Sequence, residues 1–415
     1  MSKNINMLLP QGVKNFVPSE ARGLKNAESE LLDEYYKWGY RRVITPLFEN
    51  LEAINAGLND RLKSRVMKFV DPSTGDVVAL RPDITPQICR IVATRLSHLK
   101  EPQRLCYSGR VVRFEHESSG RERELFQAGC ELVGKKDFTA DAEIMALAVN
   151  SLTRAGLSDL VLDIGHSGAV RAVERLAGKE KQAVKDALEM KSGRELARSL
   201  DASKMPASTR RKITALTQTR ETDKALSLMD SVAELKNPAA NIRSIVEVLG
   251  EYEISCEISV DACDVRNFNY YTGVTFQILH PRAAAPLIVG GRYDSLIKRY
   301  GYNTPATGFA ADVEGIVKTL SAEKKGKKET VHFVVIPTKP SLRKEAIRLS
   351  NWLRSNGFQV IAETKPRPPR KASFAMPPSY GVIAIDSPTK LRLIEANKKT
   401  TRRFSNLEEL ISGGI

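Results

Sequence analysis

Apolar and polar positions in the first 166 residues follow helical and strand periodicities in turn. Between Pro18 and Trp38 the apolar residues recur at spacings of three and four, which predicts a helix with one buried face. Ser19 is the expected N-cap, and Gly39 is expected to end the helix. The further expected elements are a strand over 43–49, a hairpin over 68–79, helices over 85–96 and 141–157, and a strand over 160–166.

The stretch from Tyr107 to Gly134 predicts a long antiparallel hairpin, because two β-prone runs flank a Ser-Ser-Gly turn. Side chains two residues apart point to the same face of a strand. Arg113 and Glu115 therefore share a face of the first strand, and Gln127, Gly129 and Glu131 share a face of the second.

If both faces border one cavity, it holds a guanidinium, two carboxylates and an amide, which suits a small zwitterion. Arg121 and Arg123 beside the turn could hold an anion. The alternative for the same pattern is an amphipathic hairpin whose charged face is solvated.

The second half of the chain changes character twice. Residues 167–250 are charged, helix-forming and poor in aromatic residues, which predicts a helical insertion. After a Lys-rich linker, alternating apolar runs predict a small α/β domain with strands expected to be parallel. The expected segments are a core in two parts (1–166 and 251–322), the insertion (167–250) and a C-terminal domain (323–415).

Charge and cysteine usage narrow the classes of function. The net charge is +15, of which residues 321–415 carry +11, so the C-terminal domain is expected to meet an acidic partner such as RNA or a protein face. The five cysteines and five histidines show no metal-ligand spacing. With neither a signal peptide nor an apolar run of membrane-spanning length, a reducing cytoplasm is the expected location.

Several motifs, taken in order, resemble the histidyl-tRNA synthetase branch of the class II aminoacyl-tRNA synthetases. Residues 112–134 resemble motif 2, the helix and strand around Pro46 resemble the dimer-forming motif 1, and residues 305–315 occupy the place of motif 3. The run 264–276 is similar to the histidine-specific signature of this branch. The resemblance implies an α+β fold: a class II synthetase-like core with an antiparallel sheet flanked by helices, carrying the insertion and a shortened anticodon-binding-like domain.

The same resemblance implies a histidine site. Asp83 would take the ammonium group with Thr85 and Gln127, and Arg266 would take the carboxylate. Glu131 and the two tyrosines of the signature would read the imidazole ring. The complete set of implied histidine-binding residues is Asp83, Thr85, Arg113, Gln127, Glu131, Arg266, Tyr270 and Tyr271, with Glu115 and Arg121 as a residual nucleotide or anion site.

This branch contains the synthetases and the regulatory subunits of ATP phosphoribosyltransferase, which are catalytically silent. The run Arg81–Gln87 is similar to the regulatory subunits, and the N-terminal run Gln11–Lys14 departs from the synthetase pattern. Gly315 stands where motif 3 of a synthetase ends in an arginine that holds the ATP phosphates, and Asp312 adds negative charge nearby. Arg113, Glu115 and the basic C-terminal domain favour the synthetase instead.

The sequence thus favours a regulatory subunit without catalytic residues, cofactor or metal. Its implied partners are a short-form catalytic subunit, in a hetero-oligomer expected to be a hetero-octamer, a second copy of the chain through the core, and L-histidine as allosteric ligand. Histidyl-tRNA synthetase, with tRNA as partner, is the alternative.

Overall fold

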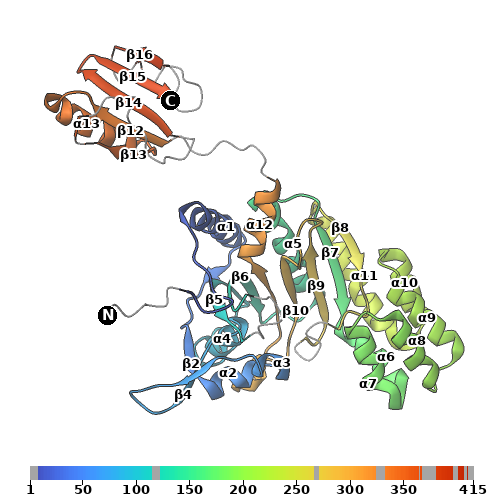
Figure 1. Cartoon of the computed structure of the whole chain (residues 1–415). Helices are drawn as coiled ribbons and strands as arrows, with labels where there is room; N and C mark the ends of the chain where they lie inside the picture. The colour runs from blue at the N-terminus through green and yellow to red at the C-terminus, as the bar shows by residue number, and fades with distance from the viewer. Residues whose placement is uncertain are drawn as a thin grey trace. The chain divides into compact units, whose positions relative to one another are not determined.

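The computed structural model describes residues 8–114, 122–265, 271–323, 332–363, 365–366, 380–395, 401–405 and 409. The chain forms two compact units, Met1–Glu323 and Lys324–Ile415, and each is considered by itself. Figure 1 shows the first unit as a sheet covered by helices, with a separate group of helices beside β8.

The sheet of the first unit joins segments from before and after the helical region. Over the described residues it has eight strands in the order β1-β5-β6-β11-β10-β9-β7-β8. The inner neighbours pair antiparallel, while β1 pairs with β5 and β7 pairs with β8 in parallel. The bounds are β1 (Arg41–Arg42), β5 (Gln103–Val112), β6 (Glu124–Val133), β7 (Val161–His166), β8 (Glu257–Val260), β9 (Val274–Leu279), β10 (Ile288–Arg292) and β11 (Ala306–Asp312).

One face of this sheet is covered by α1 (Pro18–Lys37), α5 (Phe138–Ala155) and α12 (Val313–Glu323). Leu31 of α1 and Ile144 of α5 are fully buried in the resulting core. The helix begins at Pro18 as expected, but Val17 is its N-cap rather than Ser19. Glu20 Oε2 accepts from the Val17 amide at 2.9 Å. Pro18 can stand at the first helical position because the amide it lacks would have no helical partner there.

The opposite face carries α4 (Thr85–Ile91), which continues as a π-helical turn (Val92–Leu96) and packs Ile84 and Ile88 against Tyr107. Beside it lies a small sheet of β2 (Phe48–Asn50), β4 (Val77–Leu80) and β3 (Lys68–Val70), with α2 (Leu51–Gly57) and α3 (Asp60–Lys63). The strand expected over 43–49 is not continuous. Strands flank Pro46 on both sides instead, because a proline offers no amide to a strand ladder.

The helical segment between β7 and β8 packs onto the same core. Its helices are α6 (Ser167–Ala177), α7 (Lys181–Glu189), α8 (Gly193–Ala202), α9 (Ala207–Gln218), α10 (Thr222–Asp230) and α11 (Lys236–Glu251). Val170 of α6 and Ile242 of α11 are buried in one cluster with Leu162 of β7. His166 begins α6, since its Nδ1 accepts from the Gly168 amide at 2.9 Å.

The second unit has a mixed sheet rather than the parallel one expected. Its described strands are β12 (His332–Pro337), β13 (Gln359–Ala362), β14 (Tyr380–Ser387), β15 (Lys390–Glu395) and β16 (Thr401–Phe404), in the order β13-β12-β14-β15-β16. The first three pair in parallel, and α13 (Arg343–Ser355) buries Leu349 and Leu353 against them. The strands β15 and β16, which the sequence did not predict, extend this sheet by antiparallel pairing, and a short turn joins β14 to β15.

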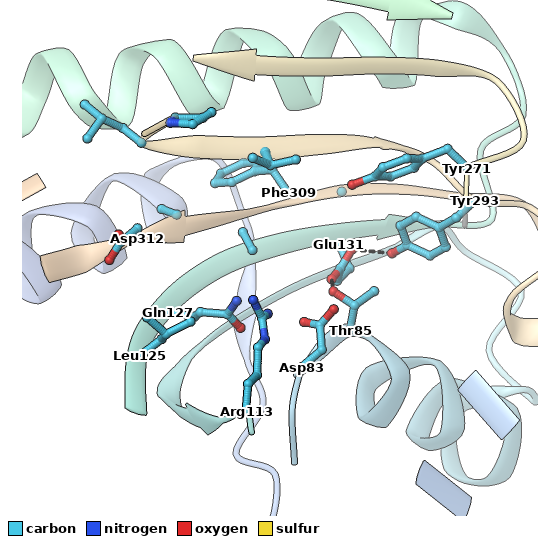
Figure 2. A pocket seen from close by; sticks show the side chains of 16 residues that line it. Asp83, Thr85, Arg113, Leu125, Gln127, Glu131, Tyr271, Tyr293, Phe309 and Asp312 are labelled. Carbon is cyan, nitrogen blue, oxygen red and sulfur yellow. Dashed lines mark hydrogen bonds between the residues drawn. The ribbon is translucent and has the colours of Figure 1, made fainter. Parts of the chain in front are cut away.

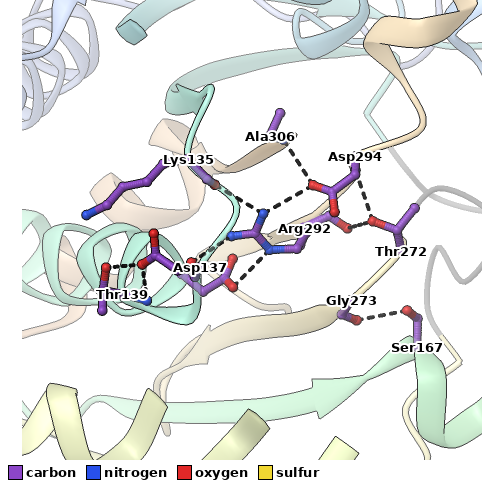
Figure 3. A network of polar contacts seen from close by, with 10 residues as sticks. Lys135, Asp137, Thr139, Ser167, Thr272, Gly273, Arg292, Asp294 and Ala306 are labelled. Atoms are coloured by element: carbon purple, nitrogen blue, oxygen red, sulfur yellow. Dashed lines mark hydrogen bonds and ion pairs between the residues drawn. The ribbon is translucent and has the colours of Figure 1, made fainter. Parts of the chain in front are cut away.

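A buried guanidinium joins β10 to α5 (Figure 3). Arg292 is 7% exposed, and its Nε donates to Asp141 Oδ2 at 2.9 Å. It also donates to the carbonyls of Lys135 and Asp137 and pairs with Asp294 at 3.1 Å. Asp294 in turn accepts from the Ala306 amide at 3.1 Å, so this one side chain holds the ends of β10, β11 and α5 together.

We expect Arg292→Met to reduce the free energy of unfolding of the first unit by about 3–5 kcal/mol, because Asp141 is left as an uncompensated buried charge. Urea unfolding followed by circular dichroism measures this. The double variant Asp141→Asn/Arg292→Met is expected to recover part of the loss, and a double variant less stable than the single one would contradict this account.

Candidate functional site

A cavity of about 250 Å³ lies over β6, β10 and β11, on the side of the sheet that α4 covers (Figure 2). Asp83 and Thr85 reach it from the start of α4, Arg113 from the end of β5, and Tyr271 from the segment before β9. Its complete lining among the described residues is Asp83, Thr85, Arg113, Leu125, Gln127, Glu131, Tyr271, Pro286, Leu287, Val289, Tyr293, Gly308, Phe309, Ala310, Ala311 and Asp312.

The buried carboxylate of Glu131 forms one end of the cavity. It is 0% exposed, Thr85 Oγ1 donates to Oε1 at 2.6 Å, and the Tyr293 hydroxyl donates to Oε2. Gly308 lies opposite on β11, where a Cβ atom would stand 1.8 Å from Oε2. A glycine is therefore required there, since any side chain would displace the carboxylate.

Burial disfavours the charged form of this carboxylate. It raises the pKa of Glu131 to about 8, although the hydroxyl donors Thr85 and Tyr293 act in the opposite direction. Burial likewise raises the pKa of Asp83, against the opposing effect of the Arg113 guanidinium. A cationic or donor group entering the cavity would favour the charged form of both carboxylates.

The middle of the cavity combines one cation, one carboxylate and one amide. Arg113 Nε donates to the Pro82 carbonyl at 2.8 Å, which holds the guanidinium beside Asp83 (Figure 2). Gln127 Oε1 is a buried acceptor without a hydrogen-bond partner among the described residues, and its side chain points into the cavity. A buried polar atom left unpaired is costly, so this oxygen suits a ligand that brings a donor such as an ammonium group.

The far end of the cavity is acidic. Asp312 Oδ1 accepts from the amides of Glu314 and Gly315, both at 3.1 Å, so Asp312 begins α12. Burial raises the pKa of Asp312. A Cβ atom at Gly315 would lie 2.8 Å from Asp312 Oδ2, which leaves little room for a larger residue.

The Glu314 side chain is already paired within the chain. It is buried and meets Lys14 Nζ at 2.6 Å and Arg110 Nη1 at 3.4 Å. None of these three residues lines the cavity: Arg110 pairs with Phe126 across β5 and β6, so its side chain lies on the face of the sheet that α1 and α12 cover. Lys14 also pairs with Glu122 at 3.0 Å, and the paired carboxylates raise its pKa although burial opposes this.

The structure brings six of the expected histidine-binding residues to one cavity: Asp83, Thr85, Arg113, Gln127, Glu131 and Tyr271. Arg266, Tyr270, Glu115 and Arg121 lie outside the described residues. Tyr293 was missed, although it follows the Gly-Gly-Arg run that ends β10. The sequence could have pointed to Tyr293 through its position at the end of an expected core strand. Only the pairing of β10 with β11, however, brings Tyr293 to Glu131.

Within the part of the chain that the structure describes, no three His, Cys, Asp or Glu side chains are grouped so that they could hold a metal ion. The described helices include none with both the length and the apolar character to cross a bilayer.

Comparison with known proteins gives a consistent result. A sequence model of the family described as "Histidyl-tRNA synthetase" matches residues 12–316. The chain is 34% identical to the ATP phosphoribosyltransferase regulatory subunit of Geobacter sulfurreducens over 86% of this chain and 82% of that protein. It is also 34% identical to the protein of the same name from Moorella thermoacetica, over 90% and 96% of the two chains.

A solved structure described as an ATP phosphoribosyltransferase regulatory subunit/histidyl-tRNA synthetase from Bacillus halodurans C has a similar fold. Its TM-score is 0.78 with 27% identity, covering 93% of this chain and 99% of that one. The similarity therefore extends over nearly the whole length of both chains.

The raised pKa of Glu131 predicts a pH-dependent effect of substitution. A group whose pKa is higher in the folded state contributes stability that is complete below its unfolded pKa, here about 4.5, and is lost as the pH rises through about 8. We expect Glu131→Gln to melt at a higher temperature than wild type at pH 9, but not at pH 5, because glutamine carries no buried charge.

Differential scanning calorimetry at both pH values measures this, with Glu124→Gln as the matched control. Glu124 lies on the same strand but outside the cavity lining. A Glu131→Gln variant with the same change in melting temperature at pH 5 and pH 9 would contradict the prediction.

Proposed function

This chain belongs to the histidyl-tRNA synthetase family, and we propose that within the family it serves as the regulatory subunit of ATP phosphoribosyltransferase. In this role it is required for the activity of a short-form catalytic subunit and makes that activity sensitive to histidine. One observation carries the proposal. The cavity has polar groups that suit an amino acid at one end, and at the other end it has the carboxylate of Asp312 where a nucleotide would need cations.

Histidine fits the described groups of the cavity one by one. Its ammonium group would pair with Asp83 and donate to Gln127 Oε1, for which the described part of the chain supplies no partner. Its imidazole would meet Glu131, which Thr85 and Tyr293 hold in place, beside the ring of Tyr271. Arg266 is the proposed partner of its carboxylate, by the resemblance to the family signature.

The end of the cavity at Asp312 supports the proposal that the chain does not adenylate histidine. In-line attack on ATP needs preorganised cations at the developing phosphate charge, and removing one such donor costs about 2.7–4 kcal/mol in the transition state. Asp312 adds a carboxylate to the cavity lining, Gly315 carries no cationic side chain, and Arg113 is the one cation among the described lining residues. We therefore propose that the chain has no catalytic activity of its own.

The proposed control follows from differential binding. The chain would dock onto the catalytic subunits, in a hetero-oligomer proposed to be a hetero-octamer, and favour their active arrangement. Histidine would bind the inhibited state more tightly, and a coupling of about 1–3 kcal/mol would suffice.

Two observations favour the second candidate, histidyl-tRNA synthetase. Arg113 keeps its guanidinium at the cavity, and the antiparallel strands β15 and β16 of the second unit carry basic residues such as Arg392 and Arg403. Such residues would suit tRNA phosphates. Arg392, however, is paired with Asp386.

We expect the catalytic subunit to gain most of its activity when this chain is added, and histidine to lower that activity. Asp83→Asn should raise the histidine concentration for half-inhibition by about tenfold or more, because a charge-assisted hydrogen bond to the ammonium is lost. Asp60→Asn, an exposed aspartate outside the cavity, is the matched control.

Histidine-dependent exchange of pyrophosphate into ATP by the isolated chain separates the two candidates. The regulatory subunit predicts no exchange above background. Robust exchange, or charging of tRNA with histidine, would assign the chain to the synthetases.

We propose further that two copies of the chain pair through an apolar surface around β2, β3 and β4. This apolar surface consists of the exposed residues Ile44, Leu47, Phe48, Phe69, Val70 and Val77. Ile44 is 84% exposed, and the rings of Phe48 and Phe69 meet edge to face at 5.7 Å. Exposed apolar side chains gathered around one small sheet are typical of protein interfaces, and motif 1 is the dimer-forming element that this region resembles.

Ile44→Asp is expected to convert the dimer into a monomer, because it places a charge in the centre of a desolvated contact. Sedimentation velocity measures the change. Ile361→Asp, at an exposed apolar residue of the second unit, serves as control and should leave the dimer intact. Equal sedimentation of wild type and Ile44→Asp would contradict this assignment of the interface.

A further inference from the structure

The first turns of α6 lie against the segment that carries Tyr271 into the cavity. The Ser167 amide and hydroxyl both donate to the Gly273 carbonyl, at 2.9 and 2.8 Å (Figure 3). One turn further along α6, Arg171 Nη1 donates to the Tyr271 carbonyl at 3.3 Å, and Nη2 donates to the Thr272 carbonyl at 2.9 Å. Arg171 Nη2 also donates to Ser167 Oγ at 3.0 Å, which joins the two side chains into one unit.

The same segment is held from its other side by β10. The Thr272 amide donates to the Arg292 carbonyl at 2.7 Å, and Thr272 Oγ1 accepts from the Asp294 amide at 2.9 Å. Among the described residues, the backbone at Tyr271 and Thr272 is thus held by β10 on one side and by α6 on the other. Tyr271 is 8% exposed and lines the cavity, so a shift of its backbone changes the shape of the cavity wall.

We propose that Arg171 is a positioning residue that couples the helical segment α6–α11 to the affinity of the cavity for its ligand. The inference rests on the proposed function, in which that ligand is histidine. A guanidinium suits this role because its planar fork can donate to two adjacent carbonyls and a hydroxyl at once, whereas a lysine ammonium offers a single point of attachment. The coupling is reciprocal: ligand in the cavity also holds α6 in place.

The helical segment keeps other attachments to the core when Arg171 is replaced. Arg220 Nη2 pairs with the buried Asp261 at 2.8 Å, and Thr222 Oγ1 donates to the Ile258 carbonyl at 3.0 Å. The apolar residues of α6 and α11 also stay packed against β7. Loss of Arg171 is thus expected to loosen one contact without detaching the segment.

The test compares Arg171→Met and Arg171→Lys with Arg175→Met in the full chain. Arg175 is exposed one turn further along the same helix and serves as the matched control. Isothermal titration with L-histidine is expected to give a dissociation constant about tenfold higher for Arg171→Met than for wild type, a factor usual for coupling between two sites. Arg171→Lys should give an intermediate dissociation constant, and Arg175→Met should give the wild-type value.

Hydrogen–deuterium exchange supplies the readout that a purely structural contact would not change. In wild type, histidine should slow amide exchange both in β6, at the cavity, and in α6. In Arg171→Met at saturating histidine, protection of β6 should persist and the additional protection of α6 should disappear.

The outcomes separate the two proposals. If wild type does not bind histidine, the proposed function falls, and this role with it. If wild type and Arg171→Met bind histidine equally, or if α6 is protected to the same degree in both, the role of Arg171 alone is overturned. Circular dichroism and the melting temperature confirm that each variant is folded before the comparison.

Discussion

The cavity depends on one buried carboxylate, whose direct contacts among the described residues include no counter-ion. Two hydroxyls, from Thr85 and Tyr293, hold Glu131 in the sheet, and burial keeps its pKa near 8. The arrangement needs Gly308 on the facing strand, because a side chain there would collide with the carboxylate. Three strands and the start of α4 must therefore be in register before this one group can be accommodated. The cost of the buried acid is compensated when a ligand donates to it.

The two ends of the cavity have opposite relations to charge. At one end, Glu131, Asp83 and Gln127 provide hydrogen-bond acceptors for a ligand. Arg113 supplies the one cation among the described lining residues. At the other end Asp312 caps α12 and adds a carboxylate to the cavity lining. A phosphate group at this end would meet negative charge rather than a cation. A binding site can remain after such a change, whereas catalysis of adenylation requires free, preorganised positive charge.

Pocket residues in this fold are held by groups outside the pocket. Arg292 ties β10 and β11 to α5 through Asp141 and Asp294, and β10 in turn holds Thr272 beside Tyr271. Arg171 approaches the same segment from the helical region. Since packed interiors change between discrete arrangements rather than continuously, attachments of this kind are the means by which a distant element can alter a binding site.

Local sequence patterns determined the elements, the long hairpin, and the family resemblance that selected Asp83, Thr85, Gln127 and Glu131 as one group. These follow from the sequence because periodicity and short motifs are properties of neighbouring residues. The role of Tyr293, the pairing of Glu314 with Lys14, and the contact of Arg171 with Tyr271 were decided only by tertiary structure. Each joins residues 100 or more positions apart. The return of β10 and β11 to the sheet begun by β5 and β6 brings Tyr293 to Glu131, and the pairing of β7 with β9 brings α6 to Tyr271. The pattern of residues within one segment does not predict such contacts, because the contacts depend on strand order and register across the whole sheet.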